Sequence, residues 1–275
     1  MTVKLLGILN ITEDSFSDGG RYLDPAAALA RGEYLANNGA DIIDLGAASS
    51  NPDGKPVPAD IEIARLGPVV AALRAKGIPI SVDTFSPEVQ LWALEQDVDY
   101  LNDVQGFRHP EIYERLAAAE ANLIVMHAVQ EGGRAERIAV SPAEILDRVL
   151  TFFGRRLPLL EAAGIARERL ILDPGMGFFL GTDPEASYKV LRHLETLRRA
   201  FSLPVLVSVS RKSFLRKITG KGPQEAGAAT LAAELFAAAK GADYIRTHEP
   251  GALKDGLLVQ RALGGNRLWG DEPAL

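Results

Sequence analysis

Short apolar runs that end on a polar, chemically capable residue recur along this sequence, and they constrain the fold more than any other feature. The run Leu5 to Leu9 ends on Asn10, and the run Leu123 to Met126 ends on His127. Six similar runs end on the following residues: Asp44, Asp83, Asn102, Asp173, Ser208 to Lys212, and Arg246 to His248. Such runs are typical of strands in a parallel sheet, which is buried on both faces. Because the carboxyl ends of these strands lie on one face, the polar residues are expected to meet in one pocket.

Helix capping is the simpler explanation for part of this pattern. Turns from strand to helix favour Asp, Ser and Asn, since these side chains cap helix N-termini. Arg, Lys and His are poor caps, so capping alone does not account for Lys212, Arg246 and His248. For the set as a whole we favour a ligand site.

Helical patterns alternate with the strands, and many begin with a capping residue followed by proline. Asp24-Pro25 and Asp183-Pro184 are examples, and proline is favoured at the first helical position. The expected helices cover residues 25–38, 58–76, 89–96, 142–163, 185–200, 226–240 and 250–263, and a further one begins at Pro110. The rhythm repeats about every 30 residues, the size of a βα unit. It predicts an α/β fold, a single-domain (β/α)8 TIM barrel over residues 1–275.

A doubly wound open sheet is the alternative fold. No Gly-x-Gly-x-x-Gly motif follows the first expected strand, which disfavours the dinucleotide-binding form of that fold. The length of 275 residues also suits one barrel better than two small domains.

Composition narrows the classes of function. The sequence has no cysteine, which excludes disulfides, thiolate metal sites and a cysteine nucleophile. Its net charge of -6 and pI of about 5.4 disfavour a nucleic-acid partner. No segment approaches the ~18 consecutive apolar residues of a membrane span, and the N-terminus lacks the pattern of a signal peptide. We therefore expect a cytoplasmic protein with no membrane or nucleic-acid partner.

Two connections between a strand and a helix are longer than a turn requires. They cover residues 11–22 and 47–57. Long loops in compact domains are usually functional. Since both would lie on the ligand face, we expect them to act as mobile lids.

Basic residues at the last strand ends predict a phosphate site. Arg246, His248 and the run Ser210-Arg211-Lys212 follow the seventh and eighth strands, where barrels commonly bind phosphate. Arg246 and His248 are expected on the same side of the chain, because side chains alternate along a strand. Asn10 offers a neutral oxygen of the kind that Mg²⁺ accepts. These residues are candidates for holding a phosphate with a divalent cation.

Three other strand ends predict a site for a heteroaromatic ring. Asp83, Asn102 and Asp173 supply acceptors for ring N–H and amino groups, and a donor for a ring carbonyl. A pterin-like ring requires this combination. Met126, Phe178 and Ile124 are expected to supply apolar walls.

The motifs resemble those of the dihydropteroate synthases. The segment from Gly7 to Gly20, GILNITEDSFSDGG, is similar to the N-terminal signature of that family. Further motifs match in order: Ser81-Val82-Asp83-Thr84, Asn102-Asp103, Met126-His127, Leu172-Asp173-Pro174-Gly175, Ser210-Arg211-Lys212-Ser213 and Arg246-x-His248. The resemblance covers roughly residues 5–265. It implies a barrel that joins 4-aminobenzoate to 6-hydroxymethyl-dihydropterin diphosphate and releases pyrophosphate with Mg²⁺, and it suggests a homodimer.

The resemblance also implies roles for individual residues, although Asp44 and His127 match the pattern without a role that we can assign. Asp83, Asp173 and Lys212 are expected to be catalytic. The implied binding residues are Asp83, Asn102, Met126, Asp173 and Lys212 for the pterin; Asn10, Ser50, Arg246 and His248 for the diphosphate, with Mg²⁺ on Asn10; and Ser50, Pro52, Phe178, Phe179 and Ser213 for the aminobenzoate.

Two segments depart from the family pattern. Where the family continues Gly-Glu-Ser-Thr-Arg-Pro-Gly, this chain reads AASSNPD from Ala47 to Asp53, so that Asn51 replaces the arginine. After Phe178 the chain continues Phe-Leu-Gly-Thr and is about two residues longer than the ordinary pattern. Both features resemble the sulfonamide-insensitive members of the family. They predict that Phe179 excludes the extra ring of a sulfonamide while admitting aminobenzoate.

Two other functions remain open. A methyltransferase that passes a folate methyl group to a corrinoid would have a similar pterin floor, but it has no diphosphate to hold, which leaves Arg246 and Lys212 without a purpose. A pterin-binding protein without activity is the other, although only the loop arginine is missing among the residues that turnover requires.

Overall fold

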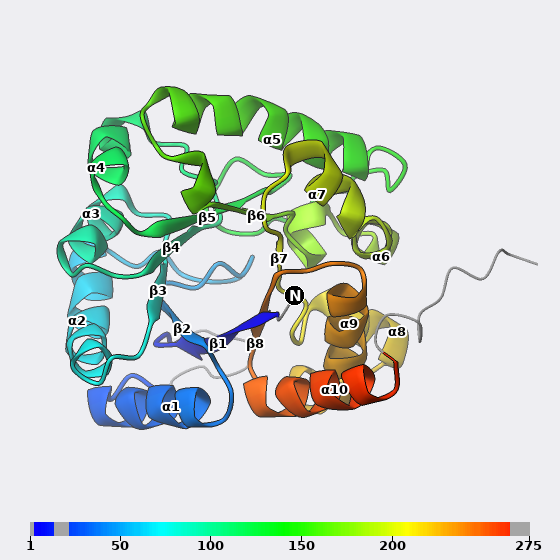
Figure 1. Cartoon of the computed structure of the whole chain (residues 1–275), viewed down its shortest axis with the longest axis horizontal. Helices are drawn as coiled ribbons and strands as arrows, with labels where there is room; N and C mark the ends of the chain where they lie inside the picture. The colour runs from blue at the N-terminus through cyan, green and yellow to red at the C-terminus, as the bar shows by residue number, and fades with distance from the viewer. Residues whose placement is uncertain (1–2, 14–21, 265–275) are drawn as a thin grey trace, which may run out of the picture.

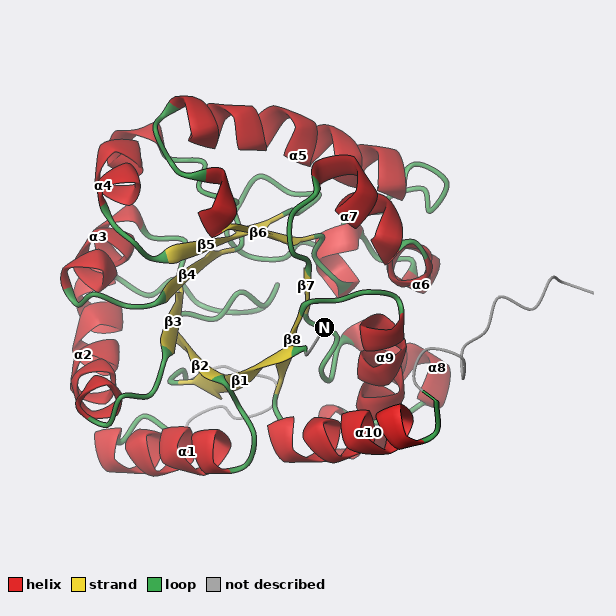
Figure 2. Ribbon diagram, in the orientation of Figure 1, coloured by secondary structure: helices red, strands yellow, loops and turns green. Residues whose placement is uncertain are grey.

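Eight parallel strands form one ring in the computed structural model, which describes residues 3–13 and 22–264 (Figure 1, Figure 2). The strands are β1 (Lys4–Asn10), β2 (Ile42–Gly46), β3 (Ile80–Asp83), β4 (Tyr100–Asp103), β5 (Asn122–Met126), β6 (Leu170–Asp173), β7 (Leu206–Val207) and β8 (Tyr244–Thr247). They are hydrogen-bonded in the order β6-β5-β4-β3-β2-β1-β8-β7. A parallel bridge between Leu172 and Val205 then joins β6 to the start of β7 and closes the ring. The predicted barrel is confirmed, and the open doubly wound sheet is excluded.

Helices surround the ring on its outside (Figure 2). The α-helices in the described part of the chain are α1 (Pro25–Asn37), α2 (Ala59–Ala75), α3 (Pro87–Glu95), α4 (Tyr113–Ala118), α5 (Ile145–Ala162), α6 (Pro184–Arg192), α7 (Leu194–Phe201), α8 (Ser213–Thr219), α9 (Gly227–Ala239) and α10 (Pro250–Ala262). Short 3₁₀ turns are η1 (Pro110–Ile112), η2 (Arg167–Arg169), η3 (Gly177–Leu180) and η4 (Pro223–Glu225). The capping prediction holds for α1 and α6, because Asp24 accepts from Ala27 N–H and Asp183 from Glu185 N–H, both at 3.0 Å.

The helix prediction was wrong in two places. The helix expected over residues 185–200 is divided at His193, where ψ changes to 26° and α6 ends before α7 begins. The short helix α8 was not predicted at all. It follows the Arg211-Lys212 run and ends at Gly220, whose φ of 70° is favourable for glycine and terminates the helix.

Side chains alternate between the inside and the outside of the ring, and this alternation positions the site. One apolar layer fills the barrel interior: Leu6, Ile42, Tyr100, Ile124, Ile171 and Leu206, with Tyr244 against it. The residues next to these along each strand, such as Leu5, Ile43 and Leu101, belong instead to the large core between the ring and the helices. Because the period is two, the residue two positions after each interior residue also points inward.

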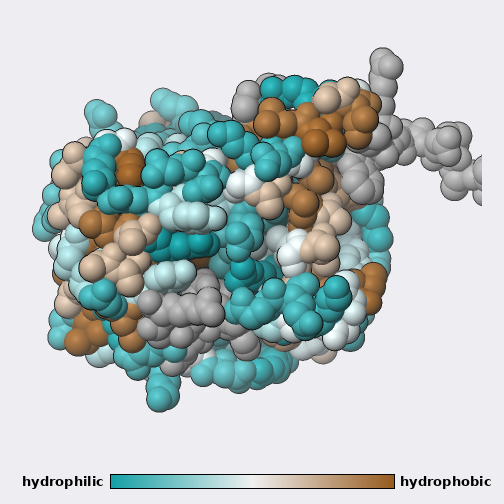
Figure 3. All heavy atoms as spheres, turned by 90° about the horizontal axis from the view of Figure 1, so that it is seen from below, coloured by the Kyte–Doolittle hydropathy of each residue, from teal (hydrophilic) through white to brown (hydrophobic). Residues whose placement is uncertain are grey.

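The outer surface is mostly polar in the view of Figure 3, with a large group of apolar atoms at the upper right and smaller groups on the left side. Large apolar side chains that remain exposed include Ile218 on α8 and Leu258 and Val259 on α10. In the described ranges, no helix is both long and apolar enough to span a membrane.

Candidate active site

Polar side chains replace apolar ones at the carboxyl end of the barrel interior. Asp44, Asn102, Asp173 and Arg246 each lie two positions after a residue of the interior layer, so they face inward as well. The register agrees, since Asp83 lies beside Asn102 on the neighbouring strand and Met126 lies beside Asp173. Of these side chains, Asp83 and Arg246 line a pocket at this end of the barrel together with residues of the following loops, and the others lie outside its lining. The sequence prediction that the strand ends meet is confirmed.

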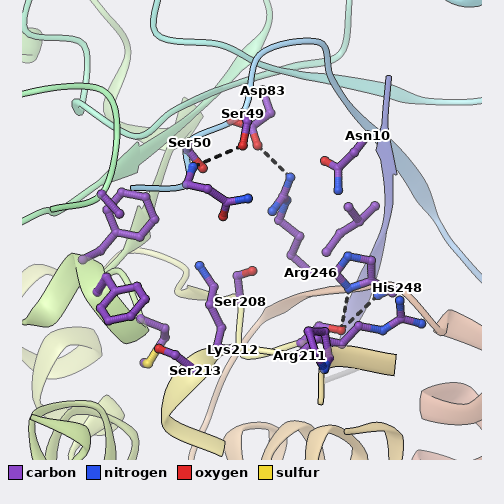
Figure 4. Close-up of a pocket in the computed structure, with 18 of the residues that line it drawn as sticks. Asn10, Ser49, Ser50, Asp83, Ser208, Arg211, Lys212, Ser213, Arg246 and His248 are labelled. Atoms are coloured by element: carbon purple, nitrogen blue, oxygen red, sulfur yellow. Dashed lines mark hydrogen bonds and ion pairs between the residues drawn. The ribbon is translucent and has the colours of Figure 1, made fainter. Parts of the chain in front are cut away.

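Arg246 lies between the carboxylates of Asp44 and Asp83, and Figure 4 shows its contact with Asp83. Its Nε donates to Asp44 Oδ2 at 2.5 Å, and its Nη2 donates to Asp83 Oδ2 at 2.7 Å. Asp44 is fully buried, and the exposed fractions of the Arg246 and Asp83 side chains are 14% and 17%. This buried ion pair holds the guanidinium in place. Separating the charges would be costly, because a buried charge would then be left uncompensated. The sequence assigned no role to Asp44; the structure shows that it holds Arg246.

The acidic and basic groups of the pocket have shifted pKa values. Burial raises the pKa of Asp83 to about 7, although the Arg246 charge opposes the shift. Burial also raises the pKa of Asp173 to about 6, against the Gly175 N–H bond and the Lys212 charge. The pKa of Lys212 is lowered to about 8 by burial and by Arg246. Groups with pKa values close to neutrality mark a functional site when they share a pocket.

Three predicted pterin residues, Asn102, Met126 and Asp173, form the floor beneath the pocket rather than its lining. All three are buried. Asn102 Oδ1 has no hydrogen-bond partner among the described residues, so it retains acceptor capacity. Asp173 Oδ1 accepts from Gly175 N–H at 2.8 Å. Met126 packs with Phe179 in a small apolar cluster.

His127 supports this floor from outside the barrel. It is buried, its Nδ1 lies 3.0 Å from the Pro174 carbonyl, and its ring packs edge-on against Phe152. Burial lowers the pKa of His127 to about 4, so the imidazole is neutral. Gly175 has a φ of 74°, and a Cβ there would lie 2.4 Å from the His127 carbonyl oxygen. His127 therefore fixes the turn after Asp173, a role that the sequence did not reveal.

Cationic groups gather on one side of the pocket. Figure 4 shows Arg211, Arg246 and His248 together, with Asn10 nearby. His248 Nδ1 lies 2.8 Å from Ser210 Oγ. Burial and the neighbouring Arg211 and Arg246 charges lower the pKa of His248 well below its usual value. The imidazole is therefore neutral and offers hydrogen bonds rather than charge, so Arg211, Lys212 and Arg246 supply the positive field.

The pocket fits a divalent cation only if the ligand supplies most of its oxygens. No group of three or more His, Asp or Glu side chains suited to a metal occurs within residues 3–13 and 22–264. Asn10 lines the pocket, and a Cβ on Gly46 would lie 3.7 Å from both Asn10 Oδ1 and Asp83 Cβ. Glycine at position 46 thus leaves space between these side chains. Mg²⁺ commonly binds through one or two protein oxygens together with substrate phosphate and water.

The predicted aminobenzoate residues line the opposite, loop-built side. Ser50, Pro52, Phe178, Phe179 and Ser213 all border the pocket, and so does Asn51. Lys212 Nζ lies 5.0 Å from the Phe179 ring centroid, within range for a cation–π contact. Phe179 is only 5% exposed, whereas Phe178 is partly exposed. Lys212 therefore links the polar strand ends to the aromatic wall.

Several pocket residues were missed by the sequence analysis. They include Ser49, Ala135, Met176, Ser208 and Arg216, whereas Arg211 had been named among the phosphate candidates. Ser208 and Arg211 lie within a run that had been singled out, but Ala135 belongs to the connection between β5 and α5, from which no site residue was predicted. The length of that connection, from His127 to Glu144, was the available signal.

Comparison with known proteins identifies the family of this pocket. Residues 6–248 match the family described as pterin binding enzyme. The chain is 58% identical to dihydropteroate synthase type-2 of Escherichia coli, over 94% of this chain and 95% of that protein. The chain belongs to the dihydropteroate synthases. The type-3 enzyme of Escherichia coli is 53% identical over 95% of this chain and 99% of that protein.

Solved dihydropteroate synthases share the barrel described above. The Yersinia pestis enzyme, solved as a complex with a sulfonamide drug, superposes with a TM-score of 0.87 at 31% identity, covering 95% of this chain and 94% of that chain. The Burkholderia cenocepacia enzyme, complexed with 7,8-dihydropteroate, gives 0.85 at 34% identity, covering 95% and 91%. The expected transferase class of this chain is therefore confirmed.

Proposed function

We propose that this dihydropteroate synthase joins 4-aminobenzoate to 6-hydroxymethyl-7,8-dihydropterin diphosphate, with Asp83, Asp173 and Lys212 as its catalytic residues. The observation that carries the assignment is the arrangement of the pocket. Asp83 borders the pocket above the buried floor of Asn102 and Asp173, and Arg246, which is ion-paired with Asp83, lies with Arg211 and His248 on the cationic side. A substrate with a hydrogen-bonding ring at one end and a diphosphate at the other matches both halves.

The pterin ring is bound by the floor and by Asp83. The carboxylates of Asp83 and Asp173 accept from ring N–H and amino groups, and Asn102 and Met126 complete the polar and apolar contacts. Burial raises the pKa of each carboxyl group and so disfavours its ionised form. An N–H donor of the bound ring acts in the opposite direction and stabilises the carboxylate. The pair then stabilises the positive charge that develops on the ring as the leaving group departs.

The diphosphate leaves as pyrophosphate from the cationic side. The bond between the exocyclic methylene carbon and the bridging phosphate oxygen breaks, and its electron pair stays on oxygen. Arg246, the hydrogen-bonding His248 and Ser50, and the neighbouring Lys212 stabilise the charge that grows there. Fixed charges aimed at developing charge are usually the largest catalytic contribution. Asn10 would hold Mg²⁺, which when bound supplies further positive charge to the phosphate oxygens.

The arylamine completes the reaction from the aromatic side. Ser50, Pro52, Phe178, Phe179 and Ser213 orient 4-aminobenzoate so that its nitrogen lone pair forms the new C–N bond, and the amine then loses a proton. Orientation of this kind lowers the activation barrier for forming the C–N bond, because the two reactants no longer have to meet in solution. The loops over residues 11–22 and 47–57 are proposed to close over the substrates, although residues 14–21 lie outside the described part of the chain.

A single assay tests the assignment. The protein is mixed with the pterin diphosphate and Mg²⁺, with and without 4-aminobenzoate, and pyrophosphate release is followed together with 7,8-dihydropteroate formation. Release that requires aminobenzoate supports the synthase. Binding without release would indicate a pterin-binding protein, and methyl transfer from methyltetrahydrofolate to a corrinoid would indicate the methyltransferase.

Reduced sulfonamide sensitivity is the second part of the proposal. Phe179 is packed against Met126 and Ala135, and Lys212 lies over its ring, so this wall cannot recede without disturbing the floor. A sulfonamide carrying a second ring needs more room there than aminobenzoate does. Inhibition constants for sulfamethoxazole in the wild type and in a Phe179 deletion decide the matter, and equal sensitivity in both contradicts it.

A homodimer is proposed on the resemblance and on the apolar surface. Ile218, Leu258 and Val259 are 70%, 54% and 57% exposed, which is unusual for large apolar side chains. Sedimentation of the wild type and of Leu258→Glu tests this proposal. A wild-type protein that sediments as a monomer would contradict it.

A further inference from the structure

The connection between β5 and α5 lies against both loops that form the aminobenzoate side. We call residues 128–140 the strap. The strap has no regular secondary structure, yet its Ala135 is 4% exposed and borders the pocket. A Cβ on Gly133 would lie 2.3 Å from the Phe85 ring, so the strap is packed closely onto the loop after β3. The strap therefore forms part of the wall of the site and is not a loop that projects from the surface.

The strap holds the loop after β2 at three points. The backbone N–H of Ala135 donates to the Ser50 carbonyl at 2.8 Å. The Arg134 guanidinium donates to the Gly54 carbonyl. Arg137 makes a two-pronged ion pair with Asp53, at 3.0 Å to Oδ1 and 2.5 Å to Oδ2. The segment that carries Ser50 and Pro52 is thus fastened to the strap.

The strap also holds the η3 segment. The backbone N–H of Val129 donates to the Phe179 carbonyl at 3.0 Å, and the N–H of Thr182 donates to the Ile138 carbonyl at 2.9 Å. The Arg137 Cζ lies 5.8 Å from the Phe178 ring centroid, within cation–π range. Arg137 therefore touches both walls, since it binds Asp53 of one and faces Phe178 of the other.

We propose that Arg137 is a positioning residue that sets the distance between these two walls and thereby determines selectivity at the aminobenzoate end. This inference rests on the proposed function. Arg137 does not border the pocket, so it acts through Asp53 and Phe178. A planar guanidinium can hold a carboxylate with two bonds and lie over a ring, whereas a lysine ammonium is a point charge.

The expected effect is selective rather than large. The Arg137 and Asp53 side chains are 53% and 62% exposed, so the ion pair contributes little to folding. A wall that shifts by a fraction of an ångström weakens the fit to a small rigid substrate. We expect Arg137→Gln to raise KM for 4-aminobenzoate about three- to tenfold. The KM for the pterin diphosphate and kcat should stay within about twofold, because the contacts of Arg137 are with Asp53 and Phe178 rather than with the strand ends.

The experiment compares steady-state kinetics of the wild type, Arg137→Gln, Arg137→Lys, Asp53→Asn and the Arg137→Gln/Asp53→Asn double variant. Arg148→Gln is the matched control, because it breaks an equally exposed Arg–Glu pair on α5. Arg137→Lys should recover part of the loss. The double variant should be no worse than Arg137→Gln alone, since both single changes remove the same ion pair. The ratio of the sulfamethoxazole inhibition constant to KM for aminobenzoate should fall in Arg137→Gln.

The two proposals fail in different ways. A wild-type protein that releases no pyrophosphate with aminobenzoate overturns the proposed function. An active wild type in which Arg137→Gln keeps its KM for aminobenzoate overturns the role of Arg137 and leaves the function intact. A parallel rise in both KM values, or a melting temperature lowered together with kcat, assigns Arg137 to general stability and also overturns the positioning role.

Discussion

The two sides of the pocket are built from different structural elements. The proposed pterin and phosphate side consists of strand ends, with Asp44, Asp83 and Arg246 joined by short bonds at low exposure. The aminobenzoate side consists of loops, and its connecting ion pair between Arg137 and Asp53 is more than half exposed. Burial makes the first set of contacts strong and rigid, whereas solvent weakens the second. Chemistry and selectivity are therefore held by interactions of very different strength.

The difference predicts that substitutions on the strand side have the largest effect on turnover. Asp83→Asn or Lys212→Ala removes a group that contacts the ring or the developing charge, so kcat/KM should fall at least about tenfold. Initial rates of pyrophosphate release measure this. Asp147→Asn on the exposed face of α5 is the matched control and should behave as the wild type. Unchanged kinetics in both Asp83→Asn and Lys212→Ala would remove them from the site.

The same difference predicts unequal losses of stability. Asp44→Asn removes the fully buried carboxylate of the pair and leaves Arg246 with Asp83 alone, which should lower the free energy of unfolding by about 3 kcal/mol. Asp53→Asn breaks an exposed pair of similar geometry and should leave the unfolding midpoint nearly unchanged. Urea unfolding of both variants provides the comparison. Equal losses in the two would show that burial does not distinguish the two sides.

The pH dependence of the pterin step provides a third test. With a pKa of about 7 for Asp83 and about 8 for Lys212, kcat/KM for the pterin diphosphate should be highest between these values. It falls at lower pH as Asp83 gains a proton, and at higher pH as Lys212 loses one. Lys212→Arg should abolish the alkaline decline, because arginine stays charged. A profile that is flat from pH 6 to 9 in the wild type contradicts the assignment.

The smallest expected effect lies on the loop side. Asn51→Arg introduces a cation where the sequence resemblance implies one, and Asn51 borders the pocket. An exposed charge of this kind should lower KM for the pterin diphosphate about two- to fivefold. The gain should vanish at high salt, because the interaction is screened. Asn51→Gln is the neutral control, and an equal gain in that variant would exclude an electrostatic cause.

The strand side could be predicted from the sequence because its signals are local. Period-two alternation and the residue that ends each apolar run place Asp83, Asn102, Asp173 and Arg246 without knowledge of distant contacts. The pairing of Arg246 with Asp44 was not predictable in this way, because the two residues lie 202 positions apart and many other carboxylates were available. Motif resemblance supplied identities for the site residues but not their partners.

The loop side could be predicted only in part. Ser50, Pro52, Phe178 and Phe179 came from the family motifs, whereas the strap carried no motif and was passed over. Its contacts are backbone hydrogen bonds and arginine side-chain contacts between irregular segments, and no sequence periodicity predicts them. The division of residues 185–200 at His193 and the short helix α8 were also missed, since local propensity is a weak guide to where a short helix begins or ends.

The alternation of side chains along the strands limits how a barrel of this kind can change over generations. A residue gained or lost inside a strand would turn the side chains that face the ligand towards the helices, and those that face the helices towards the ligand. Such a change would disrupt both the site and the core. A loop between a strand and a helix has no such alternation of inward and outward side chains. Lengthening it adds little to the entropic cost of closing the loop. Phe178 and Phe179 lie in such a connection, between β6 and α6. Residues inserted there can change the shape of the pocket mouth while the alternation along the strands is kept.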